Sequence, residues 1–417
     1  MRHYITSFAR CSGIVTALTI AVQTVPAENW PQFRGPRADG ISSEKNPPIQ
    51  WSATDNVRWK TPIPGEGHSS PVIWGSSVFL TSAAKESGHR DLLRLDAATG
   101  KVLWQKTVTT APIEAMHREN SSASSTPATD GQSVFAVFQA GDRVALSALD
   151  FDGNQLWSIQ PLQFNGEHGF SYSPILHGDL LLLDCRQEGE AAFLAVEKST
   201  GKIRWRAKPG KNRISHLSPL VVQQGGRSQV VVCGSDEIRS YEPTSGRELW
   251  FCRGPSDVAV AGLSYGDGVV FATAGYPARV RMAVRVSGSG DVTDSHVVWS
   301  SRKQVTYVPS PVYHDGHLYT AIDEGIMVCL NAKSGEAVWE QRVGGRFRSS
   351  LVLADGNVYA TNDQGLTTFF EASSKGFSPV AKNDLKELCY ATPAISSGRI
   401  YLRTGANLYC IEAAQAQ

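Results

Sequence analysis

The segment Leu95-Asp96-Ala97-Ala98-Thr99-Gly100-Lys101-Val102-Leu103-Trp104 joins the end of one apolar stretch to the start of another through a tight turn. The glycine supplies the positive φ that a short hairpin turn requires, and the Asp and Thr before it can hydrogen-bond the turn backbone. The tryptophan follows on the outgoing strand. The segment therefore predicts a hairpin whose second strand carries a large aromatic side chain.

This hairpin signature recurs along the chain. Its copies end at Trp104, Trp157, Trp205, Trp250, Trp299 and Trp339, at spacings of 53, 48, 45, 49 and 40 residues. Such a period is typical of a repeat architecture. Each repeat has room for about four short strands, too few to bury its own apolar face, so neighbouring repeats must stack into a closed ring. The sequence therefore predicts an all-β fold, a β-propeller of four-stranded, WD-like repeats.

The first strands of the repeats can be counted because most of them follow a Ser or Thr that precedes a proline. These pairs are Ser70-Pro71, Thr126-Pro127, Ser173-Pro174, Ser218-Pro219, Ser310-Pro311 and Thr392-Pro393. Proline is tolerated at the first residue of a strand, where its missing N–H does not break the ladder. Two further repeats begin without proline, near Gly262 and Ser349. The count predicts eight blades.

The last repeat contains only three strands, which end at residues 408–411. Residues 57–60, Val-Arg-Trp-Lys, parallel the fourth-strand residues 203–206 but lack other strands nearby. Adding this N-terminal strand, with Trp59, to the last repeat closes the ring and hides an exposed sheet edge. We therefore expect residues 57–417 to form one eight-bladed propeller.

The N-terminal residues have a different character. Residues 1–27 combine Arg2 and Arg10, an apolar run at 14–22 and small residues before position 28, which predicts a cleaved signal peptide. A membrane anchor would need about 20 apolar residues. Residues 28–56 form a Pro-rich, loop-like lead-in, and we expect trimming to about residue 50 to cost much less stability than deletion up to residue 61. The mature protein is predicted to be periplasmic or secreted.

Net charge and cysteine content exclude further classes of protein. Loss of the two leader arginines changes the formal net charge from +1 to −1, which does not suit a nucleic-acid binder. No later segment is apolar and long enough to span a membrane. The remaining cysteines show no metal-binding spacing, and we expect buried free thiols. A monomer without nucleic-acid partners is the expectation.

Asp96, Thr99, Gly100, Lys101 and Trp104 match the motif Ala-x-Asp-x-x-Thr-Gly-Lys-x-x-Trp, and the repeat resembles the pyrroloquinoline-quinone (PQQ) type propeller repeat. The resemblance covers nearly all of residues 57–411, and residues 30–36 and 121–127 are similar to exported PQQ-repeat proteins of planctomycete bacteria. In that family the tryptophans pack between blades, so the resemblance implies a structural role for Trp59, Trp104, Trp157, Trp205, Trp250, Trp299 and Trp339.

The resemblance leaves two functions open. Quinoprotein alcohol and sugar dehydrogenases bind PQQ with calcium on the propeller axis and use a catalytic Asp, and many alcohol dehydrogenases add a disulfide between adjacent cysteines. This chain has no adjacent cysteines, and no catalytic Asp or calcium set can be matched. The propeller lipoprotein of the outer-membrane β-barrel assembly machinery is a cofactor-free scaffold of similar length and blade number, although its lipobox is absent here. We predict an exported, non-catalytic scaffold without cofactor for an envelope protein or small ligand; the alternative is a PQQ-dependent oxidoreductase.

The loops that lead into the first strands, here called the rim loops, should gather around the axis on one face, where a rigid propeller can display binding residues. Polar residues on these loops are His68, His117, Arg118, Glu119, Asn120, Glu167, His168, Arg213, His216, Tyr307, Arg346 and Arg348. The candidate ligand site consists of His68, His117, Arg118, Glu167, His168, His216, Arg346 and Arg348. An anionic or peptide ligand would suit these residue types, and a metal would require two imidazoles to meet; the same residues also occur on plain surfaces. We assign no metal and no catalytic residue.

Overall fold

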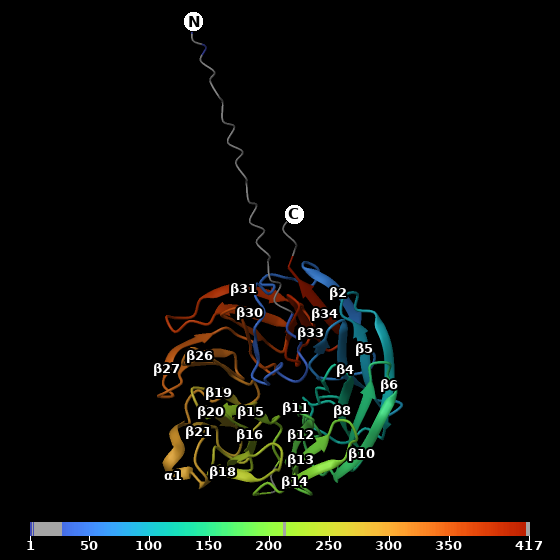
Figure 1. Cartoon of the computed structure of the whole chain (residues 1–417), viewed down its shortest axis with the longest axis vertical. Coiled ribbons are helices and arrows are strands. Elements are labelled where there is room, and N and C mark those ends of the chain that lie inside the picture. The colour runs from blue at the N-terminus through green and yellow to red at the C-terminus, as the bar shows by residue number, and fades with distance from the viewer. Residues whose placement is uncertain (2, 4–26, 212–213, 414–417) are drawn as a thin grey trace.

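The computed structural model describes residues 1, 3, 27–211 and 214–413, so most of the predicted signal peptide lies outside the described residues. The chain forms eight antiparallel blades around a central axis (Figure 1). One short helix, α1 (Thr293–His296), is found in the described part of the chain. The predicted all-β, eight-bladed propeller is confirmed.

Each blade places its short first strand at the axis and its fourth strand at the outside. Blade 1 comprises β3 (Val72–Trp74), β4 (Ser77–Ala84), β5 (His89–Asp96) and β6 (Val102–Thr110), and blade 2 comprises β7 (Ala128–Thr129), β8 (Ser133–Ala140), β9 (Arg143–Asp150) and β10 (Gln155–Gln163). Blade 3 comprises β11 (Ile175–His177), β12 (Leu180–Cys185), β13 (Ala192–Glu197) and β14 (Ile203–Ala207), and blade 4 comprises β15 (Leu220–Gln224), β16 (Arg227–Gly234), β17 (Glu237–Tyr241) and β18 (Glu248–Arg253). Blade 5 comprises β19 (Ser264–Gly266), β20 (Val269–Ala274), β21 (Val280–Arg285) and β23 (Val297–Ser301), and blade 6 comprises β24 (Val312–His314), β25 (His317–Ile322), β26 (Ile326–Asn331) and β27 (Ala337–Arg342). Blade 7 comprises β28 (Val352–Ala354), β29 (Asn357–Thr361), β30 (Leu366–Glu371) and β31 (Pro379–Asp384), and blade 8 comprises β32 (Ala394–Ser396), β33 (Arg399–Arg403), β34 (Asn407–Glu412) and β2 (Val57–Pro62).

The ring closes through the N-terminal strand, as the sequence predicts. β2 pairs antiparallel with β34, with Trp59 opposite Cys410 and Lys60 opposite Tyr409. The blue and red ends of the chain therefore share one blade (Figure 1). Because β2 is followed directly by blade 1, the N-terminal strand ties the last blade to the first.

Six of the repeat tryptophans bond one blade to the next. The Trp205 indole N–H donates to the Pro243 carbonyl of the following blade at 2.9 Å. Trp59, Trp104, Trp157, Trp299 and Trp339 make the equivalent bond to the hairpin turn of the next blade. Trp250 differs, because its indole donates to Gln229 of its own blade. The motif glycine lies against the tryptophan ring: a Cβ on Gly246 would lie 2.6 Å from Trp205. The motif thus encodes an interblade contact as well as a turn.

The segment before β2 fills the axial channel rather than forming a loose lead-in. Trp30 is buried and pairs with Ile73 of blade 1, while Gln32 accepts the Leu176 N–H of blade 3. Arg34 is 1% exposed and donates to the carbonyls of Leu263 and Pro311, in blades 5 and 6. The segment then forms β1 (Ile41–Ser42), which pairs parallel with β28 of blade 7. These residues contact several blades at the axis, so we expect them to contribute to stability; that trimming to about residue 50 costs much less than deletion up to residue 61 stays a prediction.

One chain segment also covers an outer edge. β22 (Gly290–Asp291), from the long connection in blade 5, pairs parallel with β18 at the outside of blade 4. Cys185, Cys233, Cys252, Cys329, Cys389 and Cys410 are buried free thiols, as predicted. In the described part of the chain, no helix is long and apolar enough to cross a membrane.

Candidate binding site at the propeller axis

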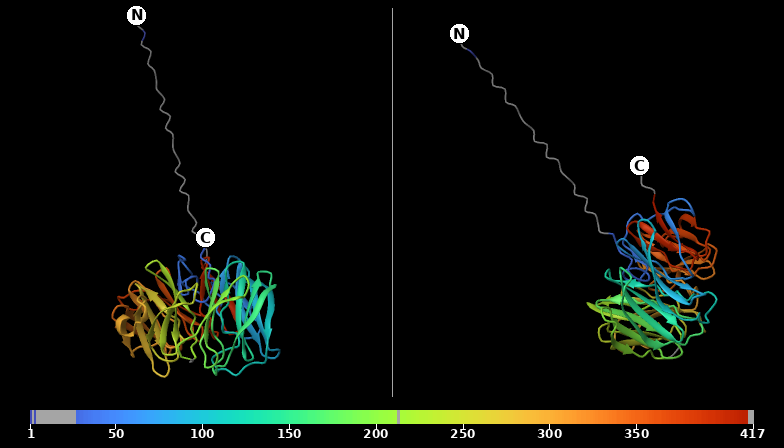
Figure 2. Two further views of the ribbon diagram at one scale, coloured as in Figure 1. Left: turned by 60° about the horizontal axis from the view of Figure 1, so that its bottom comes forward. Right: turned by 90° about the vertical axis from the view of Figure 1, so that its right-hand side faces the viewer.

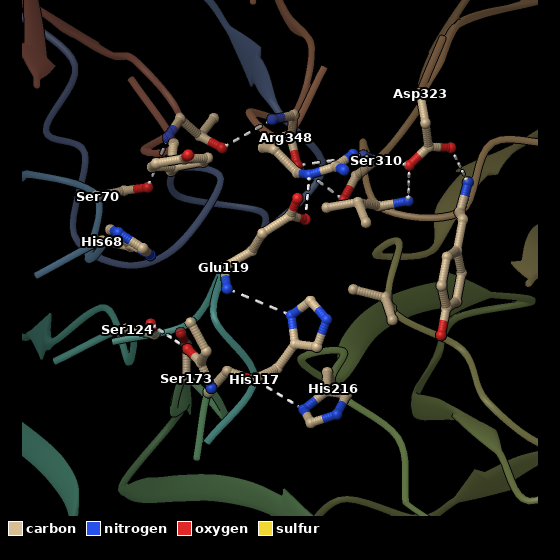
Figure 3. Close-up of a pocket in the computed structure, with 18 of the residues that line it drawn as sticks. His68, Ser70, His117, Glu119, Ser124, Ser173, His216, Ser310, Asp323 and Arg348 are labelled. Carbon is tan, nitrogen blue, oxygen red and sulfur yellow. Dashed lines mark hydrogen bonds and ion pairs between the residues drawn. The ribbon is translucent and has the colours of Figure 1, made fainter. Parts of the chain in front are cut away.

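The rim loops surround a cavity of about 520 Å³ on the axis (Figure 3). Every blade contributes to its walls, from His68 and Ser70 in blade 1 to Tyr390 and Thr392 in blade 8. Phe33, from the segment that fills the channel, also lines it. The ring of blades seen in Figure 2 is therefore hollow at one end of its axis and filled by the N-terminal segment further along.

A ring of hydroxyl groups lines the cavity. The Ser70 backbone N–H donates to Thr126 Oγ1 of the next blade at 2.9 Å, and the Thr126 N–H donates to Ser173 Oγ at 2.9 Å. The pattern continues in the other direction through Thr392, Ser350, Ser310 and Gly262. These six bonds link seven consecutive blades. Five of the six Ser or Thr residues that precede a strand-start proline, together with Ser350, thus accept a backbone N–H from a neighbouring blade and line the cavity.

Glu119 reaches across the cavity from the rim loop of blade 2. Its carboxylate lies 2.8 Å from Arg346 Nη2 and 2.9 Å from Arg348 Nε, both on the rim loop of blade 7 (Figure 3). Partial burial opposes ionisation, but the hydrogen bonds and charges of the two arginines hold the pKa of Glu119 below its ordinary value. Glu119 is therefore a carboxylate clamped by two guanidinium groups.

The other acidic residues that line the cavity are also paired with arginine. Asp323 accepts the N–H groups of Tyr307 and Val308 and lies 3.4 Å from Arg348, and burial raises its pKa despite these partners. Glu324 lies 3.0 Å from Arg279. Calcium in proteins takes six to eight oxygen ligands, usually including carboxylates. Here those carboxylates are already neutralised by guanidinium groups, so the donor set does not fit calcium.

Three histidines stack along one wall of the cavity. The rings of His117 and His168 lie 5.8 Å apart and nearly parallel, and those of His168 and His216 lie 6.2 Å apart. His68 packs separately against Tyr390, at 4.6 Å between ring centroids. Among the described residues no group of three or more His, Cys, Asp or Glu side chains is placed to hold a metal ion. The imidazoles therefore form an aromatic wall.

Two of these histidines are held in the neutral form. Burial, followed by the nearby His168 and His117, lowers the pKa of His216 to about 4. Burial and the Arg403 guanidinium likewise lower the pKa of His68 to about 4. His216 Nδ1 lies 2.8 Å from Ser171 Oγ, but within the described residues no carboxylate orients this imidazole. A nucleophile activated by a histidine normally needs such an orienting group, so the pair does not make a hydrolytic triad.

The structure gathers six of the eight candidate residues around the cavity. These are His68, His117, His168, His216, Arg346 and Arg348. Arg118 and Glu167 are exposed and do not line it. Of the other rim-loop residues, Arg213 lies outside the described residues. That these residues bind a ligand stays a prediction.

Sequence reasoning missed the hydroxyl ring, Phe33 and Asp323. A signal for the ring is present, because a Ser or Thr precedes each of the six strand-start prolines, but the pattern by itself indicates only a strand start. Asp323 lies in the loop between the second and third strands of blade 6, and Phe33 lies in the N-terminal segment. Neither position is on a rim loop, so neither was considered.

Comparisons with known proteins agree with this architecture. A PQQ-repeat family model described as outer membrane protein assembly factor BamB matches residues 41–160, 144–308 and 285–375. No sequence among the curated proteins is a significant match. BamB from Moraxella catarrhalis has a similar solved structure (TM-score 0.59, 12% identity), with 85% of this chain and 99% of that chain covered.

Two solved dehydrogenases share the fold as well. The quinohemoprotein alcohol dehydrogenase ADHIIG from Pseudomonas putida HK5 matches with a TM-score of 0.63 at 12% identity, over 93% of this chain and 81% of that chain. A europium-containing methanol dehydrogenase matches with a TM-score of 0.56 at 10% identity, over 92% of this chain and 98% of that chain. At these identities the similarity shows a common fold.

Proposed function

We propose a function from the premise that this chain belongs to the PQQ-repeat family described as outer membrane protein assembly factor BamB. The proposal is that the protein is an exported, monomeric, non-catalytic scaffold of the cell envelope. The proposed binding face is the one that carries the rim loops and the axial cavity. It would engage an envelope protein or a small ligand without a cofactor.

The observation that carries this proposal is the charge pairing inside the cavity. Glu119, Asp323 and Glu324 are each paired with an arginine, so none is an unpaired carboxylate of the kind that calcium usually takes. Neutral histidines and backbone-bonded hydroxyls make up much of the remaining polar wall. Such a wall offers hydrogen bonds and aromatic surface, which suit recognition.

The binding face can be tested by capture of partners from an envelope fraction with matched variants. Arg346 is 54% exposed and pairs with Glu119 at the cavity. Arg204, on the outer strand β14, is 48% exposed and pairs with Glu197. We expect Arg346→Ala to abolish capture of a specific partner and Arg204→Ala to retain it. Equal capture by the two variants would contradict the assignment of the binding face.

The alternative function is PQQ-dependent oxidation, which is motivated by the shared fold of the two dehydrogenases. Purified protein would be mixed with PQQ and calcium, freed of excess quinone and assayed with an artificial electron acceptor. The scaffold proposal predicts no retained quinone absorbance and no dye reduction. Stoichiometric uptake together with dye reduction would replace the scaffold by an oxidoreductase.

A further inference from the structure

We propose that Arg346 and Arg348 form a carboxylate-binding subsite, that Glu119 fills this subsite from within the chain, and that a ligand's carboxylate displaces Glu119. This inference rests on the proposed function and deepens it, because it names the chemical group that the cavity recognises. The ligand is a molecule that ends in a carboxylate, either the C-terminus of a peptide or a small organic acid.

The geometry at Glu119 is that of a bound anion. Its two carboxylate oxygens contact different guanidinium groups, Oε1 with Arg346 and Oε2 with Arg348. Arg346 and Arg348 follow Glu119 by 227 and 229 positions in the sequence, and the contacts cross the cavity between blades 2 and 7. Arginine binds carboxylates through such charge-assisted hydrogen bonds. Asp323, which lies 3.4 Å from Arg348 Nη1, helps to orient that side chain toward the cavity.

Glu119 is placed where it can leave the subsite. It sits in the connection between β6 and β7, which contains no helix or strand. One anchor lies on each side of it: Glu114 pairs with the buried Arg90 at 2.6 Å, and the Asn120 side chain donates to the His168 carbonyl at 2.8 Å. The exposed Ala115 and Arg118 lie between these anchors. Within the tip, the His117 N–H donates to the His168 carbonyl and the Asn120 N–H donates to the His117 carbonyl. The loop backbone therefore stays attached, and Glu119 leaves the subsite by rotation of its side chain.

The surroundings favour an anion once Glu119 has moved. Arg34 and Arg403 are buried behind the cavity wall, and both donate only to neutral oxygens among the described residues. Burial lowers the pKa of Arg403 to about 9 and that of Arg34 to about 10, although Asp39 partly opposes the shift of Arg34. Both groups still carry a positive charge at neutral pH. The charge of Arg403 reaches the cavity, because it helps to lower the pKa of His68, which lines the cavity.

The test uses isothermal titration with three probes: N-acetyl-dialanine with a free carboxylate, the same peptide as its C-terminal amide, and acetate. We expect Glu119→Gln to bind acetyl-dialanine at least about tenfold more tightly than the wild type, because the internal competitor loses its charge. The amide should not bind. Adding Arg348→Gln to the Glu119→Gln variant should abolish binding of the free acid.

Glu197→Gln is the matched control, because Glu197 is a carboxylate paired with an arginine, Arg204 at 3.0 Å, but lies outside the cavity. It should leave the affinity for acetyl-dialanine at the wild-type value, and circular dichroism should show all variants folded. If Glu119→Gln binds no better than the wild type, or binds the amide equally well, the proposal is overturned. Tighter binding of acetyl-dialanine than of acetate identifies a peptide C-terminus, and equal binding identifies a small acid. If the protein captures its partner but binds no carboxylate, this inference is wrong and the proposed scaffold function stands. If it binds the carboxylate but captures no partner, the proposed scaffold function is wrong.

Discussion

At the residue scale, the repeat glycine and tryptophan act as a pair across the blade boundary. The sequence predicts the turn from the glycine and the packing from the tryptophan, since both signals are local and periodic. It does not predict that the glycine faces the preceding blade's tryptophan, because that contact depends on how blades stack. Trp250 illustrates the limit: its motif is regular, yet its indole bonds Gln229 instead of the next blade.

Gly246→Ala tests this pairing against Gly356→Ala. The two glycines have nearly the same positive φ, 71° and 72°, so the backbone strain is matched. A Cβ at Gly246 would clash with Trp205, whereas a Cβ at Gly356 meets nothing within 4 Å. We expect Gly246→Ala to lower the free energy of unfolding by about 1–3 kcal/mol more than Gly356→Ala, as in an overpacked core. Urea denaturation of both variants would show the difference; equal losses would refute the interlock.

The histidines of the cavity predict a pH dependence of stability. The pKa of His68 and of His216 is about 4 in the folded protein, below the ordinary histidine value of 6.5 that applies to the unfolded chain. Between pH 4 and pH 6.5 the unfolded chain therefore binds more protons than the folded protein. Stability should be complete above pH 6.5 and fall toward pH 4, by at most about 1.4 kcal/mol per pH unit for each histidine. In denaturant titrations, His216→Gln should lose less stability than the wild type between pH 7 and pH 5. An identical slope would show that His216 is not held neutral.

At the element scale, the strands are predictable and the N-terminal segment is not. Strand starts, turns and apolar runs repeat eight times, so each copy supports the others. Residues 28–56 occur once and have no strand period, and their contacts are distant in sequence: Arg34 bonds residues 229 and 277 positions away. Local patterns carry no information about such contacts. For the same reason the sequence places Glu119 on a rim loop but does not pair it with Arg346 and Arg348.

The segment that fills the channel should therefore matter for stability. Trp30 is 1% exposed, and Trp30→Ala should cost about 3–5 kcal/mol, as for other buried tryptophans. Arg37, in the same segment, is 49% exposed and forms surface ion pairs, so Arg37→Ala should cost less than about 1 kcal/mol. Chemical denaturation compares the two variants. A small effect at Trp30 would contradict a stabilising role for this segment.

At the scale of the whole molecule, closure makes blades 1 and 8 interdependent. β2 completes blade 8 and Trp59 bonds the Ala97 carbonyl of blade 1. Deleting residues 28–62 should therefore speed hydrogen exchange in β3–β6 as well as in β32–β34, compared with the protein that begins at residue 28. Exchange that rises in blade 8 alone would mean that the ring is not cooperatively closed.

The central claim is that the cavity-bearing face binds an envelope partner. Tyr276 and Leu388 are exposed at 64% and 59% on this face, and the Asp179 side chain is 77% exposed in a turn on the opposite face. A photo-crosslinking amino acid placed at each position, in the intact envelope, tests the claim directly. We predict the same adduct from positions 276 and 388 and none from 179. Adducts from 179 alone, or none from the cavity face, would contradict it.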